Sequence, residues 1–157
     1  MTTIEHNFAP RALVVEDNST NLLVARRMLE IGGFQVEVAM NGRDAVEAAR
    51  HQLFDVILMD IHMPLLDGCE AAREIRQIPG SPGRVPIIGL SASVFTEDRR
   101  RCLEAGADDF IGKPYQAGEL IAKCRLWLDR GRCGDPVLAE ESGSAPKAVA
   151  VACGQTG

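Results

Sequence analysis

Val56-Ile57-Leu58-Met59-Asp60 is the stretch that decides the fold of this chain. Its four apolar residues form a short, continuous run, which is typical of a strand buried on both faces of a parallel sheet. A carboxylate is excluded from such a core, so Asp60 marks the end of the strand. In open α/β sheets, ligands bind in the crevice beyond the carboxyl ends of the strands. The stretch therefore predicts an α/β fold with a site at Asp60.

Polar residues also stand at the ends of three other predicted strands. Glu16 and Asp17 follow Ala12-Leu13-Val14-Val15, Ser91 follows Ile87-Ile88-Gly89-Leu90, and Lys113 follows Asp109-Phe110-Ile111-Gly112. With Asp60, these strand ends supply three acids, a hydroxyl and an amine. Such a set can hold a divalent cation and a phosphoryl group at one point, because Mg²⁺ prefers oxygen ligands and a lysine pairs with phosphate as a point charge.

Strand and helix patterns alternate along most of the chain. We expect strands at 12–16, 35–39, 56–60, 85–91 and 109–113, and helices at 20–31, 42–51, 67–78, 96–105 and 116–129. Five such units predict a parallel sheet with right-handed crossovers and helices on both faces. We divide the chain into an arm at 1–10, one domain at 11–130, and a Gly/Ala/Pro-rich tail or linker at 131–157 that is too short for a second domain.

Composition limits the class of protein. The 157 residues are 46% hydrophobic and 25% charged, as expected for a folded domain. The net charge of −5 argues against a surface that binds nucleic acid directly. The start of the chain has no apolar signal region, and no apolar run approaches the roughly 20 residues of a membrane span. We therefore expect a cytoplasmic protein without direct membrane contact.

The five cysteines are scattered, odd in number and without a CxxC pair. A disulfide framework or a zinc site is therefore not expected, and a reducing compartment is the simpler interpretation. Cys69, Cys102 and Cys124 stand among helical residues, where we expect them to act as small core hydrophobes.

Four motifs stand in order along the chain: Val14-Val15-Glu16-Asp17-Asn18, the stretch Leu58 to Gly68 (LMDIHMPLLDG), Gly89-Leu90-Ser91-Ala92-Ser93, and the stretch Ala105 to Pro114 (AGADDFIGKP). Together they resemble the receiver domains of two-component response regulators. The likeness covers residues 11–130, and the local sequence of the motifs is most similar to that of receivers of hybrid histidine kinases and phosphorelays. The resemblance implies a flavodoxin-like doubly wound sheet with strand order 2-1-3-4-5.

The resemblance also implies a role for each matching residue. Asp60 would accept a phosphoryl group from a phosphohistidine on a histidine kinase or a histidine phosphotransfer protein. Mg²⁺ would be held by Glu16, Asp17, Asp60 and the main-chain carbonyl of His62. Ser91 and Lys113 would contact the phosphoryl oxygens, Pro114 would follow a cis peptide bond, and Phe110 would be the aromatic whose orientation follows phosphorylation.

The predicted helix at 20–31 has more apolar residues than one sheet-facing stripe requires. We interpret the surplus around Leu22, Leu23 and Met28 as a docking patch for the phosphodonor, with loosely buried core residues as the alternative. His62 would line the mouth of the site. The oligomeric state is left open, as is the choice between a stand-alone regulator, a relay shuttle and a receiver cut from a hybrid kinase.

Other classes fit less well. A phosphatase of the haloacid-dehalogenase type would need a second Asp two residues after Asp60, where His62 stands. A nucleotide-binding module would need glycines in the loop after the first strand, which instead reads Glu16-Asp17-Asn18-Ser19-Thr20. An interaction module without phosphotransfer would not need the complete set of acids, serine and lysine. Taken alone, Ser91 would be interpreted as an ordinary turn hydroxyl. Lys113 as only a structural ion-pair partner is disfavoured, because a structural pair would not need three acids.

Overall fold

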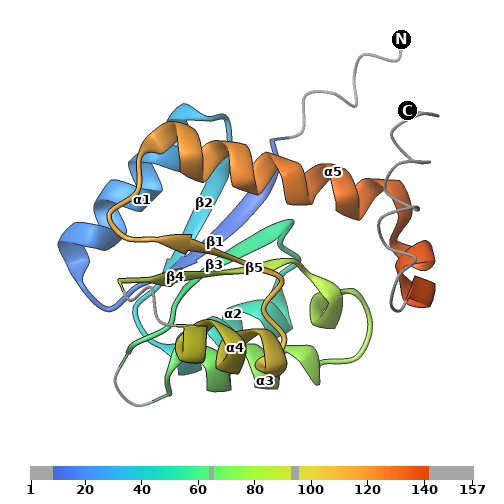
Figure 1. Ribbon diagram of the computed structural model, residues 1–157. Helices are drawn as coiled ribbons and strands as arrows, with labels where there is room; N and C mark the ends of the chain where they lie inside the picture. The colour runs from blue at the N-terminus through green and yellow to red at the C-terminus, as the bar shows by residue number, and fades with distance from the viewer. Residues whose placement is uncertain (1–8, 64–65, 93–95, 142–157) are drawn as a thin grey trace, which may run out of the picture.

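The computed structural model describes residues 9–63, 66–92 and 96–141. Within these ranges it has one parallel sheet of five strands in the order β2-β1-β3-β4-β5 (Figure 1). The strands are β1 (Arg11–Val15), β2 (Gln35–Ala39), β3 (Val56–Asp60), β4 (Ile87–Ser91) and β5 (Asp109–Gly112). Strand order and direction are those expected from the sequence.

Helices cover both faces of the sheet. Figure 1 shows α1 (Ser19–Ile31) and α5 (Ala117–Glu141) on one face, and α2 (Gly42–His51), α3 (Gly68–Arg76) and α4 (Thr96–Ala105) on the other. A 3-10 helix, η2 (Ser81–Arg84), leads into β4. None of the helices in the described ranges is long and apolar enough to span a membrane.

The buried side chains form two clusters, one on each side of the sheet. The strand β3 shows why: Ile57 and Met59 point into the cluster under α2, α3 and α4, whereas Val56 and Leu58 point into the cluster under α1 and α5. All five β3 residues are buried. An uninterrupted apolar run is thus what a central parallel strand requires, because both of its faces are covered.

Local sequence sets the starts of the helices that flank the strand ends. The side chains of Asn18, Asn41 and Asp67 each accept a hydrogen bond from the backbone N–H three residues further on, so they cap α1, α2 and α3. Gly68 begins α3 directly against the main chain of Asp60, where an added Cβ would overlap the carbonyl oxygen. The return of the chain to the acidic strand end therefore depends on a glycine.

Several boundaries differ from the sequence expectation, most of them by one or two residues. The fourth strand begins at Ile87 rather than residue 85, and residues 81–84 form η2 within the segment expected to be a loop. The last helix continues to Glu141 instead of ending near Asp129. An isolated glycine costs a helix only about 1 kcal/mol relative to alanine, and elongation is easier than nucleation, so Gly131 did not end it. Residues 142–157 of the expected tail lie outside the described residues.

Candidate functional site

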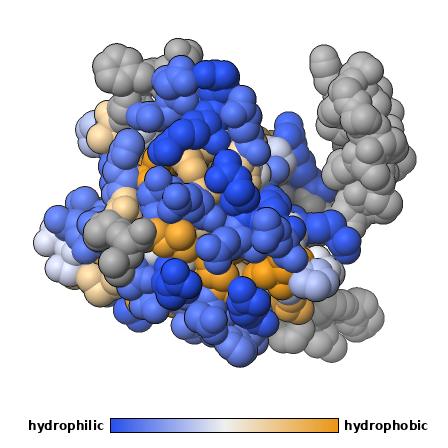
Figure 2. Space-filling model, turned by 90° about the horizontal axis from the view of Figure 1, so that it is seen from below, coloured by the Kyte–Doolittle hydropathy of each residue, from blue (hydrophilic) through white to orange (hydrophobic). Residues whose placement is uncertain are grey.

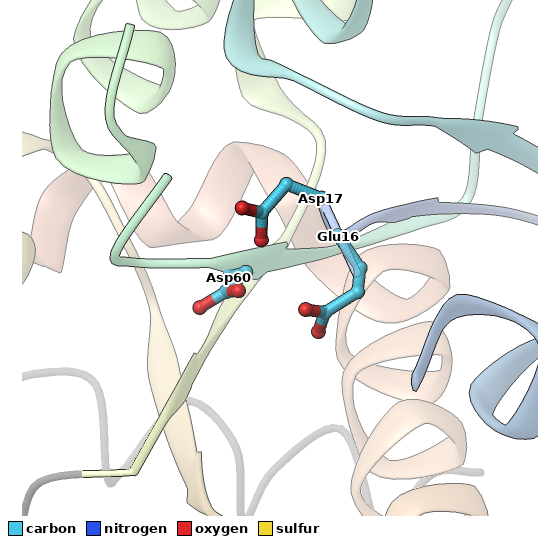
Figure 3. A group of neighbouring side chains, drawn as sticks. All are labelled: Glu16, Asp17 and Asp60. Carbon is cyan, nitrogen blue, oxygen red and sulfur yellow. The ribbon is translucent and has the colours of Figure 1, made fainter. Parts of the chain in front are cut away.

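Three carboxylates lie together at the carboxyl edge of the sheet (Figure 3). Glu16 and Asp17 follow β1, and Asp60 is the last residue of β3; these neighbouring strands are in register with Val15 opposite Met59. One oxygen from each of the three carboxylates lies within 4.8 Å of the others. Asp17 is exposed, whereas Glu16 and Asp60 are buried. Gathered oxygen ligands with one side open to water suit Mg²⁺, which retains several waters when bound.

Lys113 brings a positive charge to the same point from the end of β5. Its Nζ lies 3.1 Å from Glu16 Oε1 and 3.4 Å from Asp60 Oδ2. The peptide bond from Lys113 to Pro114 is cis, as expected from the sequence. The backbone N–H of Lys113 donates to the carbonyl oxygen of Ser91 at 2.8 Å, which holds the ends of β4 and β5 together. Ser91 is buried at this edge, so every strand end predicted to carry chemistry meets here.

The environment of Asp60 raises the pKa of its carboxyl group from 3.8 to about 6. Burial is the largest cause, because it penalises the charged form; Lys113 opposes it, and the charge of Glu16 adds to it. Burial, together with the charges of Glu16 and Asp60, raises the pKa of Tyr115, two residues after Lys113, to about 12. The site therefore carries excess negative charge, which a cation or a protonated group would relieve.

His62 is in the loop after Asp60. Its backbone N–H donates to Asp60 Oδ1 at 3.3 Å, and its exposed imidazole Nε2 lies 3.4 Å from Asp98 Oδ2 of α4. The imidazole thus sits at the rim of the site, as expected from the sequence. The role of the His62 carbonyl as a metal ligand remains a prediction.

Phe110 is already turned into the core. Its side chain is 9% exposed, and its ring packs so closely on β4 that a Cβ added at Gly89 would lie 2.9 Å from it. The guanidinium of Arg99 in α4 lies 5.4 Å from the centre of the ring. A phosphorylation-dependent turn of this ring remains a prediction.

The predicted docking patch on α1 needs a correction. Leu22 is 8% exposed and belongs to the core, so it is not available to a partner. Leu23 is 57% exposed, and Met28 is partly buried against the core. Val24 and Ile31 are also exposed, although the sequence analysis did not select them. A helix rich in apolar residues on more than one face leaves its rotation undetermined until it packs on the sheet.

One contact between two cysteine side chains was not predicted from the sequence. Cys69 in α3 and Cys102 in α4 are both buried, as expected, but their Sγ atoms lie only 2.7 Å apart. The residues are 33 positions apart in the sequence, with no spacing pattern that would have revealed their contact.

Comparison with known proteins decides the family. Residues 12–125 match the family model of the response regulator receiver domain. The chain belongs to the response regulator receiver family. The order of its motifs, its sheet topology and the acidic site agree with that membership.

Relatives of this receiver domain occur both in response regulators and in sensor kinases. It is 39% identical over 122 residues to the transcriptional regulatory protein PrrA of Mycobacterium tuberculosis, covering 78% of this chain and 51% of PrrA. It is 36% identical to the sensor protein GacS of Pseudomonas syringae over 121 residues, covering 76% of this chain and 13% of GacS. The chain thus spans about half of PrrA and a small part of GacS.

A solved structure adds information on the metal. The receiver domain of the sensor histidine kinase PA1611 from Pseudomonas aeruginosa has 40% sequence identity and a TM-score of 0.73, covering 77% of this chain and 98% of that domain. That structure contains a magnesium ion coordinated in its active site cleft.

Proposed function

We propose that Asp60 of this receiver domain accepts a phosphoryl group from a phosphohistidine and that the chain works as a phosphorylation switch or relay. The observation that carries the proposal is the meeting of two further carboxylates and Lys113 around one strand-end aspartate. In the reaction, an Asp60 oxygen bonds to phosphorus while the N–P bond of the donor breaks. The bonding electrons stay with the donor imidazole, which ends as a neutral ring after proton exchange with solvent.

In the proposed reaction, Lys113 and Ser91 contact different phosphoryl oxygens. Lys113, which now pairs with Glu16 and Asp60, would pair with a phosphoryl oxygen and keep the negative charge of the product in balance. The hydroxyl of Ser91, at the end of the neighbouring strand, would donate to another oxygen. Such transfer depends mainly on positioning and charge stabilisation, which these fixed strand ends supply.

The cofactor we propose is Mg²⁺, held by Glu16, Asp17, Asp60 and the carbonyl of His62. The donor set fits this ion, because the carboxylates converge within 4.8 Å and Asp17 leaves one side open to water. Bound Mg²⁺ supplies positive charge that reduces repulsion between the carboxylates and the incoming phosphoryl oxygens. Burial, with a smaller contribution from the charge of Glu16, raises the pKa of Asp60, and a bound cation would favour the charged carboxylate.

The partner we propose is a histidine kinase or a histidine phosphotransfer protein, which would place the protein in the cytoplasm. The donor must approach Asp60 from beyond the strand ends, and α1 starts directly beside them at Ser19. The exposed Leu23 and Val24 of α1 would lie under the partner. Arg26 and Glu30, which form an ion pair at 3.1 Å, would stand at the rim and affect orientation more than affinity.

Phosphorylation of Asp60 would be transmitted through Ser91 and Phe110 to α4. Ser91 would shift toward the new phosphoryl oxygens, and the Phe110 ring, already packed beneath Arg99 of α4, would adjust to it. Comparing amide chemical shifts with and without a phosphoryl mimic tests this route. Shift changes confined to the acidic residues would contradict it.

Labelling with acetyl phosphate tests the central proposal. The wild type in Mg²⁺ should form an acid-labile acyl phosphate, the Asp60→Asn variant should form none, and excess chelator should abolish labelling of the wild type. Asp129→Asn, a change at an exposed aspartate of α5, is the matched control and should be labelled normally. Undiminished labelling of Asp60→Asn would disprove the assignment of the acceptor.

A further inference from the structure

The contact between α3 and α4 contains a buried pair of thiols. Cys69 is the second residue of α3 and Cys102 lies near the end of α4, and Figure 1 shows these helices on the same face of the sheet. Both residues are free thiols, 2% and 3% exposed, with their Sγ atoms 2.7 Å apart. A disulfide bond is about 2.05 Å long, so a further approach of roughly 0.7 Å would join the two sulfurs.

We propose that Cys69 and Cys102 are a redox modification site, at which a peroxide converts the two thiols into a reversible disulfide that fastens α4 to the start of α3. This property is separate from phosphotransfer. It needs neither a phosphodonor nor Mg²⁺.

The two sulfurs have different parts in this reaction. The hydrogen bond between the two sulfurs lowers the pKa of Cys69, and the guanidinium of Arg101 acts in the same direction. The position of Cys69 in the first turn of α3 also favours a thiolate. The same pairing and burial raise the pKa of Cys102. Cys69 is therefore the attacking sulfur and Cys102 the sulfur that completes the bond.

The reaction takes two steps. The Cys69 thiolate attacks one peroxide oxygen, so an S–O bond forms and the O–O bond breaks; the second oxygen leaves as hydroxide and becomes water on protonation. Cys102 then attacks the sulfur of the sulfenic acid, so the S–S bond forms and the S–O bond breaks, releasing a second water. The two sulfurs lose two electrons in total, and the peroxide is reduced to two waters. A reduced thiol such as dithiothreitol reverses the product by disulfide exchange.

The packing of α4 explains how an oxidant can reach buried sulfurs. Among the described side chains of this helix, Cys102 and Ala105 are the buried ones, whereas α3 buries Cys69, Ala71, Ala72 and Ile75. A helix held by two small buried side chains opens locally at a lower free energy than one held by more buried side chains, among them a large one such as Ile75. Figure 2 shows the side of the molecule that carries these helices, where hydrophilic side chains surround a few hydrophobic ones.

The disulfide would act next to the phosphorylation site. Two polar contacts already join α4 to the segment that leads from Asp60 into α3: the His62 imidazole with Asp98 at 3.4 Å, and the ion pair of Asp67 with Arg101 at 3.6 Å. These are exchangeable contacts on the surface. The disulfide at Cys102, one turn after Asp98, would hold α4 against this segment until the bond is reduced.

The test uses the full 157-residue chain, reduced and then treated with hydrogen peroxide. Remaining thiols are alkylated, and the digest is mapped by mass spectrometry without reduction. We expect a Cys69–Cys102 cross-linked peptide as the main product, lost again with dithiothreitol. Cys69→Ser and Cys102→Ser should abolish it. Cys124→Ala, which removes the buried cysteine on the other side of the sheet, is the matched control and should keep it.

The peptide map of the oxidised wild type needs no substitution, so it tests the proposal even if a cysteine variant folds poorly. Cross-links dominated by Cys133 or Cys153, or single oxidation of Cys69 without a bond to Cys102, would overturn the proposal. So would unchanged alkylation of both residues in peroxide. As a second readout, closing a loop of this size should raise Tm of the oxidised protein by roughly 5–10 °C. A fall in Tm would show that the bond does not fasten α4 in its native position.

Discussion

Replacing Asp60 by asparagine should stabilise this protein, although it removes the residue on which its activity depends. The carboxyl group is buried beside Glu16, and burial is the main cause that raises its pKa to about 6 from 3.8. The folded state therefore resists ionisation of Asp60 more than the unfolded chain does. Asparagine has nearly the same shape and carries no charge, so the variant is free of this cost.

The pKa gives the size and the pH range of the effect. A difference of about two pKa units corresponds to roughly 3 kcal/mol, which is an upper limit for the gain; we expect about 1–3 kcal/mol. Well below pH 3.8, Asp60 is neutral in both states and costs nothing. As the pH rises from about 4 to 6, the unfolded chain ionises Asp60 while the folded protein still holds it protonated, so the wild type loses stability over this range. The advantage of Asp60→Asn should therefore grow from about pH 4 to pH 6 and stay constant above it.

Urea unfolding of the wild type and Asp60→Asn from pH 4 to pH 8, in chelator, measures this difference. Asp129→Asn, at an exposed position of α5, should change the free energy of unfolding by less than about 0.5 kcal/mol at every pH. A variant less stable than the wild type at pH 7.5, or a gain independent of pH, would refute the reasoning.

Repeating the unfolding experiment in Mg²⁺ without chelator tests the metal site without phosphotransfer. A ligand at 100 times its Kd stabilises the protein that binds it by about 2.7 kcal/mol. The wild type and Asp129→Asn should gain stability in Mg²⁺, whereas Asp60→Asn should gain much less, because it lacks one of three converging carboxylates. Equal stabilisation of all three proteins would place the ion elsewhere.

Three further predictions concern the surroundings of the site. Leu23→Asp should slow transfer from a phosphohistidine protein by about tenfold, the effect of losing roughly 1.4 kcal/mol at the interface, and leave labelling by acetyl phosphate nearly unchanged; equal losses in both assays would indicate a folding defect. Arg76→Met should lower the free energy of unfolding by about 2–4 kcal/mol in urea, because the guanidinium pairs with Asp108 and donates to three loop carbonyls; a change under about 0.5 kcal/mol would contradict this. Gly89→Val should cost about 1–3 kcal/mol, since its side chain would meet the Phe110 ring, and Phe110→Leu in the same chain should recover part of that loss; no recovery would mean that the clash lies elsewhere.

Much of the fold was predictable because the spacing of apolar residues in most segments matches the side of the strand or helix that is buried. The helix at 96–105 and the strand at 56–60 have the bounds expected from the sequence, and Asp67, where the third helix was expected to begin, caps α3. The errors fell where such agreement is weak. Glycines after residue 130 suggested an early end to the last helix, which nevertheless continues to Glu141. Leu22 and Leu23 are chemically identical, so their opposite burial became apparent only when α1 packed on the sheet.

By itself, the sequence determined which chemical groups reach the site. An apolar strand forces the first polar residue after it out of the core, and parallel strands end at one edge, so Glu16, Asp60, Ser91 and Lys113 had to gather there. Only the tertiary structure decided how closely they approach, and hence the raised pKa of Asp60. It also decided that the Cys69 and Cys102 sulfurs meet. Such properties depend on the rotation and spacing of elements distant in the chain, which are set by packing of the whole domain and leave no mark in a local pattern.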